Sequence, residues 1–133
     1  MKNKDIITLV SGGFLSATAH SIPNEHFYKF FRFRREVEKA VRALGDAQTA
    51  LMRECGIDPA KFHEASGEPL ERYGEANNRL LEEDCGVEVK ARIPFEFYKG
   101  LYDENKTAAG DIFANNAVEV VIIDNLFNTD DNE

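Results

Sequence analysis

The stretch FYKFFRFRREVEKAV, residues 27–41, dominates this sequence. Its first nine residues contain four phenylalanines, a tyrosine and four basic residues. Such a stretch either offers rings and cations to nucleic acid or packs one side of a helix into a core. Phe30, Phe33, Val37 and Leu44 recur at spacings of three and four residues, which predicts that this part of the stretch is a core-facing helical stripe.

The same spacing continues well beyond the stretch. It predicts one helix of about 32 residues that begins near Ser21-Ile22-Pro23-Asn24-Glu25, with proline in its first turn, and stops at Gly56. A helix of that length is roughly 48 Å long and must pack against other elements along its length. The predicted core positions are Phe30, Phe33, Val37, Ala40, Val41, Leu44, Ala47, Leu51 and Cys55.

A second helix is predicted from about Glu68 to Asp84, after a connection over residues 57–67. Because a short loop joins them, we expect the two helices to pack antiparallel as a long hairpin. Residues 27–42 carry six basic and two acidic side chains, whereas residues 64–84 carry seven acidic and two basic ones. This contrast favours ion pairs between the two helices.

Two short strands are predicted. DIITLV, residues 5–10, is β-branched and ends at Ser11-Gly12-Gly13, and VEVKARI, residues 87–93, alternates apolar and polar residues. Pro94 then opens a short helix, PFEFYKGLY, and a loop follows around ENKTAAGD. Residues 116–127 combine strand-like composition with a capping-box-like start, and we favour a helix there.

These elements predict one mainly α domain of the α+β class over residues 1–127. It consists of a long antiparallel helix hairpin, a small two-stranded sheet and short C-terminal helices. Residues 128–133, NTDDNE, are expected to form a disordered acidic tail.

The composition narrows the classes of function. The formal net charge of the 133 residues is -8, so the overall field opposes binding to nucleic acid or anionic membranes. No apolar run reaches the length that spans a bilayer, and the N-terminus lacks the pattern of a signal peptide. Two cysteines are too few for a secreted disulfide framework, so we expect a cytoplasmic protein.

No motif in the sequence points to catalysis, a cofactor or a metal. Cys55 and Cys85 precede glycines at opposite ends of the expected hairpin, too far apart for a disulfide. His20 and His26 are six residues apart, a spacing that suits no metal site. Ser11-Gly12-Gly13 lacks the lysine of a phosphate-binding loop. We therefore expect a protein that is not an enzyme.

The strongest candidate site is a partner interface at the start of the long helix. Four aromatic residues within five positions are too many for one buried stripe, so some must meet a second layer or another subunit. The candidate residues are Phe27, Tyr28, Phe31, Arg32 and Arg35. The alternative is nucleic-acid binding by the basic face of the helix, through Arg32, Arg34, Arg35, Lys39 and Arg42.

The order of elements also resembles small uncharacterised proteins encoded by phages and prophages. The resemblance lies in the strand and glycine turn, the Ser-Ile-Pro entry to a charged helix ending near MRECG, and the segment ERYGEANNRLLEEDCGVEVKARIPFEFYKGL. It implies a phage-related role in assembly or host takeover through protein contacts. We therefore expect a non-enzymatic interaction or assembly protein, as a homo-oligomer or with another phage or host protein.

Overall fold

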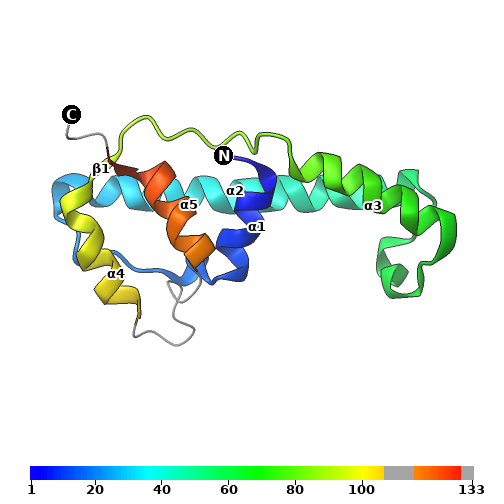
Figure 1. The fold of residues 1–133 in the computed structure, drawn as a ribbon, viewed down its shortest axis with the longest axis horizontal. Coiled ribbons are helices and arrows are strands. Elements are labelled where there is room, and N and C mark those ends of the chain that lie inside the picture. Colours follow the sequence, from blue (N-terminus) through cyan, green and yellow to red (C-terminus); the bar gives the residue numbers. More distant parts are fainter. Residues whose placement is uncertain (107–115, 130–133) are drawn as a thin grey trace.

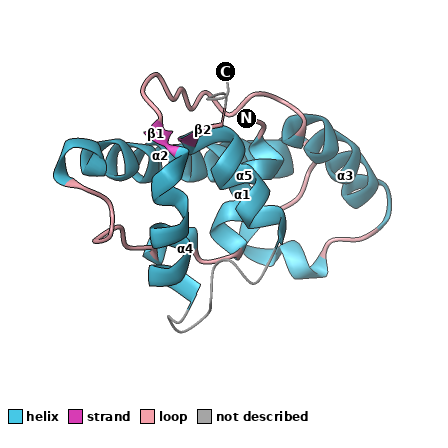
Figure 2. Cartoon of the chain, turned by 60° about the vertical axis from the view of Figure 1, so that its left-hand side comes forward, coloured by secondary structure: helices cyan, strands magenta, loops and turns pink. Residues whose placement is uncertain are grey.

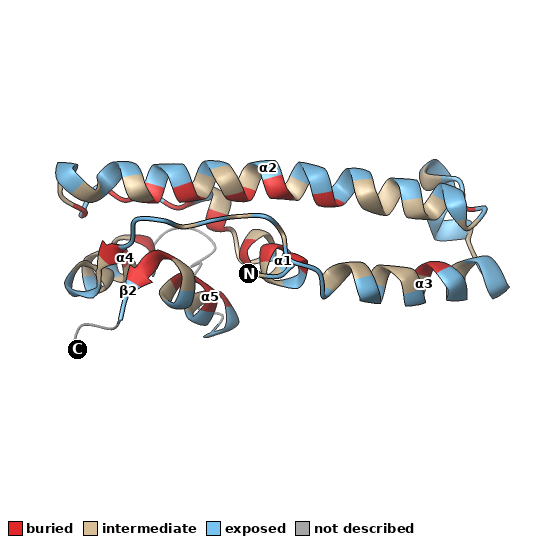
Figure 3. Cartoon of the chain, turned by 90° about the horizontal axis from the view of Figure 1, so that it is seen from above, coloured by how far each residue is buried: buried red, intermediate tan, exposed pale blue. Residues whose placement is uncertain are grey.

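A single long helix organises the molecule. The computed structural model describes residues 1–106 and 116–129, and helix α2 (Asn24–Glu54) runs the full length of the fold with the other elements along one side of it (Figure 1, Figure 3). The other helices are α1 (Asn3–Ser11), α3 (Gly67–Leu81), α4 (Tyr98–Lys106) and α5 (Asn116–Leu126), with short 3-10 turns η1 (Phe14–Ser16), η2 (Pro59–Glu64) and η3 (Phe95–Phe97). The strands are β1 (Ile93–Pro94) and β2 (Phe127–Asn128).

Helix α2 confirms the prediction made from its apolar spacing. Pro23 precedes its first residue, and Gly56 follows its end with a φ of 84°, a conformation that favours glycine. Five of the predicted core positions are buried: Phe30, Phe33, Val37, Ala40 and Leu44. The remaining four are only half-buried: Val41, Ala47 and Leu51 in the C-terminal half of α2, and Cys55 just after its last residue. The tightest packing therefore lies against the N-terminal half of α2.

Phe14, in η1, sits at the centre of that packing. Its side chain is completely buried and makes edge-to-face ring contacts with Phe30 at 5.7 Å and Phe33 at 5.6 Å. Around this trio lie fully buried side chains from α1 and α5, including Leu9 and Ile122. Within the aromatic stretch at the start of α2, Phe30 and Phe33 therefore belong to the core, as their spacing predicts.

The predicted strand over residues 5–10 is wrong, because these residues form helix α1. The Lys2 backbone N–H donates to the Asp5 carboxylate at 2.9 Å, which caps the first turn. Ile6 and Leu9 are three residues apart and both buried, so a helix places them together on the core. Burial of this face outweighs the strand preference of the β-branched residues.

The predicted sheet is present but is built from other residues. β1 pairs with β2 in parallel, with Ile93 opposite Phe127 and Pro94 opposite Asn128 (Figure 2). Of the expected strand 87–93, only Ile93 lies in a strand, while residues 87–92 cross the molecule unpaired. Residues 116–126 are the helix that we favoured. Asn128, which we expected to be the first residue of the acidic tail, is the second residue of β2.

Two other expectations fall partly outside the described residues. The expected loop around ENKTAAGD begins inside α4, which extends to Lys106, and the rest of it lies outside them. Residues 130–133 of the expected disordered tail lie outside them as well.

The full-length helix hairpin is not confirmed. Helix α3 lies beside only the C-terminal half of α2 (Figure 3), where the side chains of Gln48 and Asn77 are hydrogen-bonded at 3.0 Å. The basic N-terminal half of α2 instead packs on α1, α5 and β1. Consequently no ion pair joins α2 to α3 in the part of the chain that the structure describes.

Just beyond the end of α3, one acidic residue pairs with α1 and its N-cap instead. The Glu82 carboxylate accepts from Lys2 at 2.6 Å and from Lys4 at 2.8 Å. These hydrogen bonds lower the pKa of Glu82 to about 2. The pairing joins the N-terminus to the end of α3, although all three side chains are exposed to solvent.

Helix α4 holds the turn that leads into α2. The buried Asn105 side chain accepts from the Thr18 backbone N–H at 3.0 Å and donates to the Thr18 carbonyl at 2.9 Å. The Glu104 carboxylate accepts from the backbone N–H groups of His20 at 2.7 Å and Ser21 at 2.8 Å. Burial opposes the charge on Glu104, but hydrogen bonds from the 18–21 turn outweigh it and lower the pKa of the carboxyl.

The hydrogen bonds between Glu104 and the 18–21 turn predict a pH-dependent contribution to the free energy of unfolding. A carboxyl whose pKa is lowered by folding stabilises the folded state above its unfolded pKa, and this contribution disappears as the pH falls through the folded value. We expect Glu104→Gln to lower the free energy of unfolding by about 1–2 kcal/mol at pH 7 and by progressively less below about pH 4.5. Urea titrations of both proteins from pH 3 to 7 measure this, and a pH-independent difference would contradict it.

A close helix contact gives a second prediction. A Cβ atom on Gly12 would lie 2.4 Å from Cγ2 of Val118, whose side chain is fully buried in α5. We expect Gly12→Ala to destabilise the fold by about 1–3 kcal/mol. The matched control is Gly45→Ala in α2, where nothing lies within 4 Å and alanine should stabilise the helix by about 1 kcal/mol. Chemical denaturation of the two variants should show effects of opposite sign.

Candidate partner interface

Three aromatic side chains are exposed on the outer face of α2, close to its start. Phe27 is 38% exposed, Tyr28 54% and Phe31 40%. Tyr28 and Phe31 lie about 100° or more round the helix from the buried stripe of Phe30 and Phe33. Phe27 borders that stripe, since it is about 60° from Phe30. The sequence prediction that the aromatic stretch divides between core and surface is therefore met by the geometry.

Arginines flank these rings in two different ways. The Arg35 guanidinium lies 5.7 Å from the Phe31 ring centroid and is exposed. Arg34 also lies 5.8 Å from that ring, but it donates to the Ala17 carbonyl at 2.6 Å, so it holds the turn before α2. Arg32 and Arg42 are exposed, and neither forms an ion pair within the described residues. Arg34 thus has a structural role, and the other arginines are the free cations of this face.

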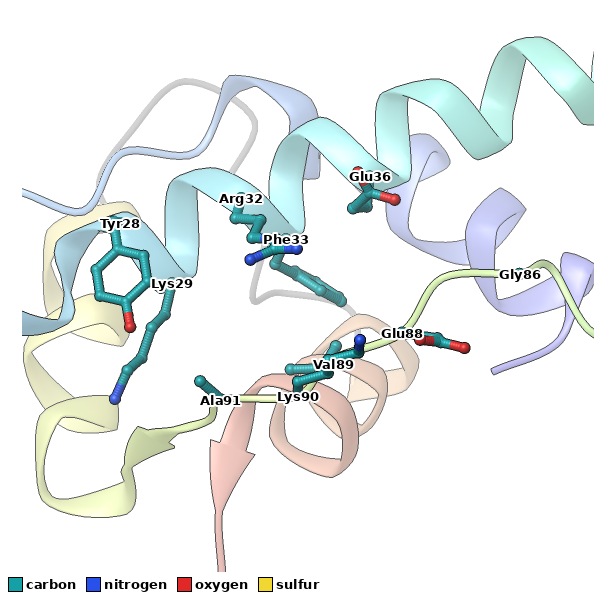
Figure 4. A pocket seen from close by; sticks show the side chains of 10 residues that line it. All are labelled: Tyr28, Lys29, Arg32, Phe33, Glu36, Gly86, Glu88, Val89, Lys90 and Ala91. Atoms are coloured by element: carbon teal, nitrogen blue, oxygen red, sulfur yellow. The ribbon is translucent and has the colours of Figure 1, made fainter.

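A pocket of about 230 Å³ opens at the edge of the same face. Tyr28, Lys29, Arg32, Phe33 and Glu36 of α2 form one wall, and Gly86 with residues 88–91 forms the other. Figure 4 shows Phe33 projecting from α2 into the space above Val89. Of the five predicted interface residues, Tyr28 and Arg32 border this pocket, whereas Phe27, Phe31 and Arg35 lie outside it. The second wall was not predicted as part of the site, although its alternating sequence was visible.

Acidic side chains gather on the outer face of α3. Glu68, Glu71 and Glu75 are exposed there, one turn apart along the helix. Glu68 contacts Arg72 at 3.9 Å, while Glu71 and Glu75 form no ion pair in the described part of the chain. Tyr73, the buried residue of α3, lies about half a helical turn round from Glu71 and Glu75, so the acidic face lies off the packed side of α3. The aromatic face lies off the buried stripe of α2, and α3 runs along the side of α2 that carries this stripe (Figure 3), so the two faces lie on opposite sides of the molecule.

The cysteines and histidines lie apart. Cys55 and Cys85 are free and half-buried, and burial raises the pKa of the Cys85 thiol. Among the described residues, no group of histidine, cysteine, aspartate and glutamate side chains is arranged to hold a metal ion. None of the helices in the same residues has both the length and the apolar character needed to cross a membrane.

Comparisons with known proteins identify no relative of this chain. No protein-family model, no curated protein and no solved structure matches this chain. The candidate interface is therefore argued from its own geometry.

The free energy of unfolding can distinguish the structural role of Arg34 from the surface position of Arg35. Removing the Arg34 side chain leaves the carbonyl of buried Ala17 without its hydrogen bond, so Arg34→Ala should lower the free energy of unfolding by about 1–3 kcal/mol. Arg35→Ala, next to it but on the surface, should change it by less than about 0.5 kcal/mol. Urea denaturation of the pair checks this, and equal effects would refute the distinction.

Proposed function

We propose that this protein is a non-enzymatic assembly protein that acts through protein–protein contacts, and that its first partner is another copy of itself. The observation that carries the proposal is the aromatic and cationic face of α2, formed by Phe27, Tyr28, Phe31, Arg32 and Arg35. Exposed aromatic rings and arginines are the residue types that contribute most to protein interfaces.

Charge indicates which surface meets this face. Arg32 and Arg35 lie in the N-terminal half of α2 and form no ion pair with the acidic residues of α3, because α3 lies beside the other half of α2. The acidic face of α3, with Glu71 and Glu75, is therefore available to a neighbour. Because the two surfaces lie on opposite sides of the molecule, their contact is head-to-tail and builds a ring or an open chain rather than a two-fold dimer.

The biological setting belongs to the same proposal. A phage-related role in particle assembly or host takeover is supported only by the resemblance in the order of sequence elements. A cytoplasmic setting is supported by the number of cysteines, and both of them are free.

Charge reversal tests the contact between copies. We expect light scattering after size exclusion to show assemblies larger than one chain that dissociate as salt rises, since the contact pairs opposite charges. The variant Arg32→Glu with Arg35→Glu and the variant Glu71→Lys with Glu75→Lys should each weaken assembly at least about tenfold. A mixture of the two variants should assemble again, because each altered face then meets one of opposite charge.

Lys61→Glu is the matched control, because Lys61 is an exposed cation on η2 and belongs to neither face. A wild-type protein that stays monomeric at high micromolar concentration and low salt would overturn the contact. Nucleic acid is the competing partner for the cations of α2. A labelled single-stranded DNA or RNA that shifts with monomeric protein at low salt, and no longer shifts with the arginine variant, would favour that alternative.

A further inference from the structure

Residues 87–91 have the sequence of a strand and lack the partner of one. Val87 and Val89 are half-buried and pack against the core, while Glu88 and Lys90 point to solvent. This alternation is that of a strand with one buried face. The segment runs without helix or turn as far as Lys90 and bends at Ala91, just before β1.

The fold itself cannot supply the missing partner. β1 and β2 pair in parallel with Ile93 opposite Phe127, so extending the ladder toward residue 87 would require Leu126 and the residues before it. Those residues form helix α5, and their backbone groups are bonded within it. Among the described residues, the backbone groups of residues 88–91 make no hydrogen bond. Unpaired groups of this kind are a template for another strand.

The pocket beside α2 runs along this unpaired segment. Phe33 and Val89 give it an apolar floor, and at about 230 Å³ it has room for side chains of an added segment. Two cations on its walls, Arg32 and Lys90, have no ion-pair partner within the described chain. Of its two acids, Glu36 is paired with Lys39 at 3.2 Å, and Glu88 points away along the segment toward Gly86 (Figure 4).

We propose that this groove binds an extended peptide segment of a partner protein, which adds as a strand to residues 87–91. The backbone of the peptide would satisfy the open N–H and C=O groups of the segment. Its side chains alternate, so apolar residues enter the pocket over Phe33 and acidic residues between them meet Arg32 and Lys90. This goes beyond the assembly contact, because the occupant is a single extended strand rather than the acidic face of α3.

Short synthetic peptides test the mode of binding. The probe is a blocked peptide in which valine and glutamate alternate, titrated into the full chain by calorimetry. We expect a dissociation constant in the micromolar range, and slower amide hydrogen exchange in residues 87–91 when the peptide is bound. The same peptide with alternate backbone nitrogens methylated keeps its side chains but loses strand hydrogen bonds, and should bind at least about tenfold more weakly.

Protein variants test the selection by charge. Lys90→Glu should weaken binding of the glutamate peptide about tenfold and improve binding of a valine–lysine peptide, whereas Lys61→Glu should leave both unchanged. Lys90 and Lys61 are both exposed, so neither change should affect folding, and thermal melting checks this. Phe31→Glu with Arg35→Glu should impair assembly while peptide binding persists, which separates this groove from the proposed assembly contact.

Three results would overturn the proposal. The first is no heat of binding and no exchange protection at millimolar glutamate peptide. The second is an undiminished affinity after backbone methylation, which would show that no strand is added. The third is equal binding of the lysine peptide to the wild-type protein, which would show that Arg32 and Lys90 do not select an acidic segment.

Discussion

The contact between Phe14 and the two rings of α2, Phe30 and Phe33, is the interaction on which the rest of this structure depends. In a protein most of the stability of a helix comes from packing of its apolar face, so a helix of 31 residues depends on apolar cover along one side. The edge-to-face trio provides that cover where the helix begins. Helices α1 and α5 complete it by burying Leu9 and Ile122 around the same rings. Hydrogen bonds also hold residues 17–21, the turn that precedes α2. They come from Arg34 of α2 and from Asn105 and Glu104 of α4.

Because the core lies at one end, the two halves of α2 have different neighbours. The N-terminal half is packed on its inner side by α1, α5 and β1, and the C-terminal half is covered by α3 and η2. Five of the seven basic residues of α2 lie in its first half, and the acids of α3 lie beside the second. Their separation leaves charges of both signs unpaired on opposite sides of a protein whose net charge is -8. A surface charge costs little in water, so the fold tolerates this arrangement. Between molecules, however, the same arrangement is complementary.

Much of the candidate interface was predictable from the sequence, for a physical reason. A helix can hide only one stripe of side chains, so an excess of rings within two turns has to appear on the surface. This reasoning identified Phe27, Tyr28 and Phe31 as exposed residues. It did not separate Arg34 from Arg35, since only the path of the preceding turn brings the Ala17 carbonyl to Arg34. The groove was missed because its second wall, residues 88–91, comes from a segment more than fifty residues away along the chain.

The sequence by itself determined the elements whose signals are local. The apolar period and Gly56 set the extent of α2, and Pro94 opens the η3–α4 helical segment. The alternation of residues 87–90 predicts which of their side chains face the core, although Ala91, expected on the same face, is exposed. Only the tertiary structure decided what depends on distant neighbours. Residues 5–10 form a helix because a helix buries both Ile6 and Leu9 in one core. This burial outweighs the strand preference of the β-branched residues in the segment. Residues 87–91 have no strand partner, because the residues that would extend the β1–β2 ladder beside them form helix α5. A strand needs hydrogen-bond partners that its own sequence cannot provide, whereas a helix carries its partners within itself.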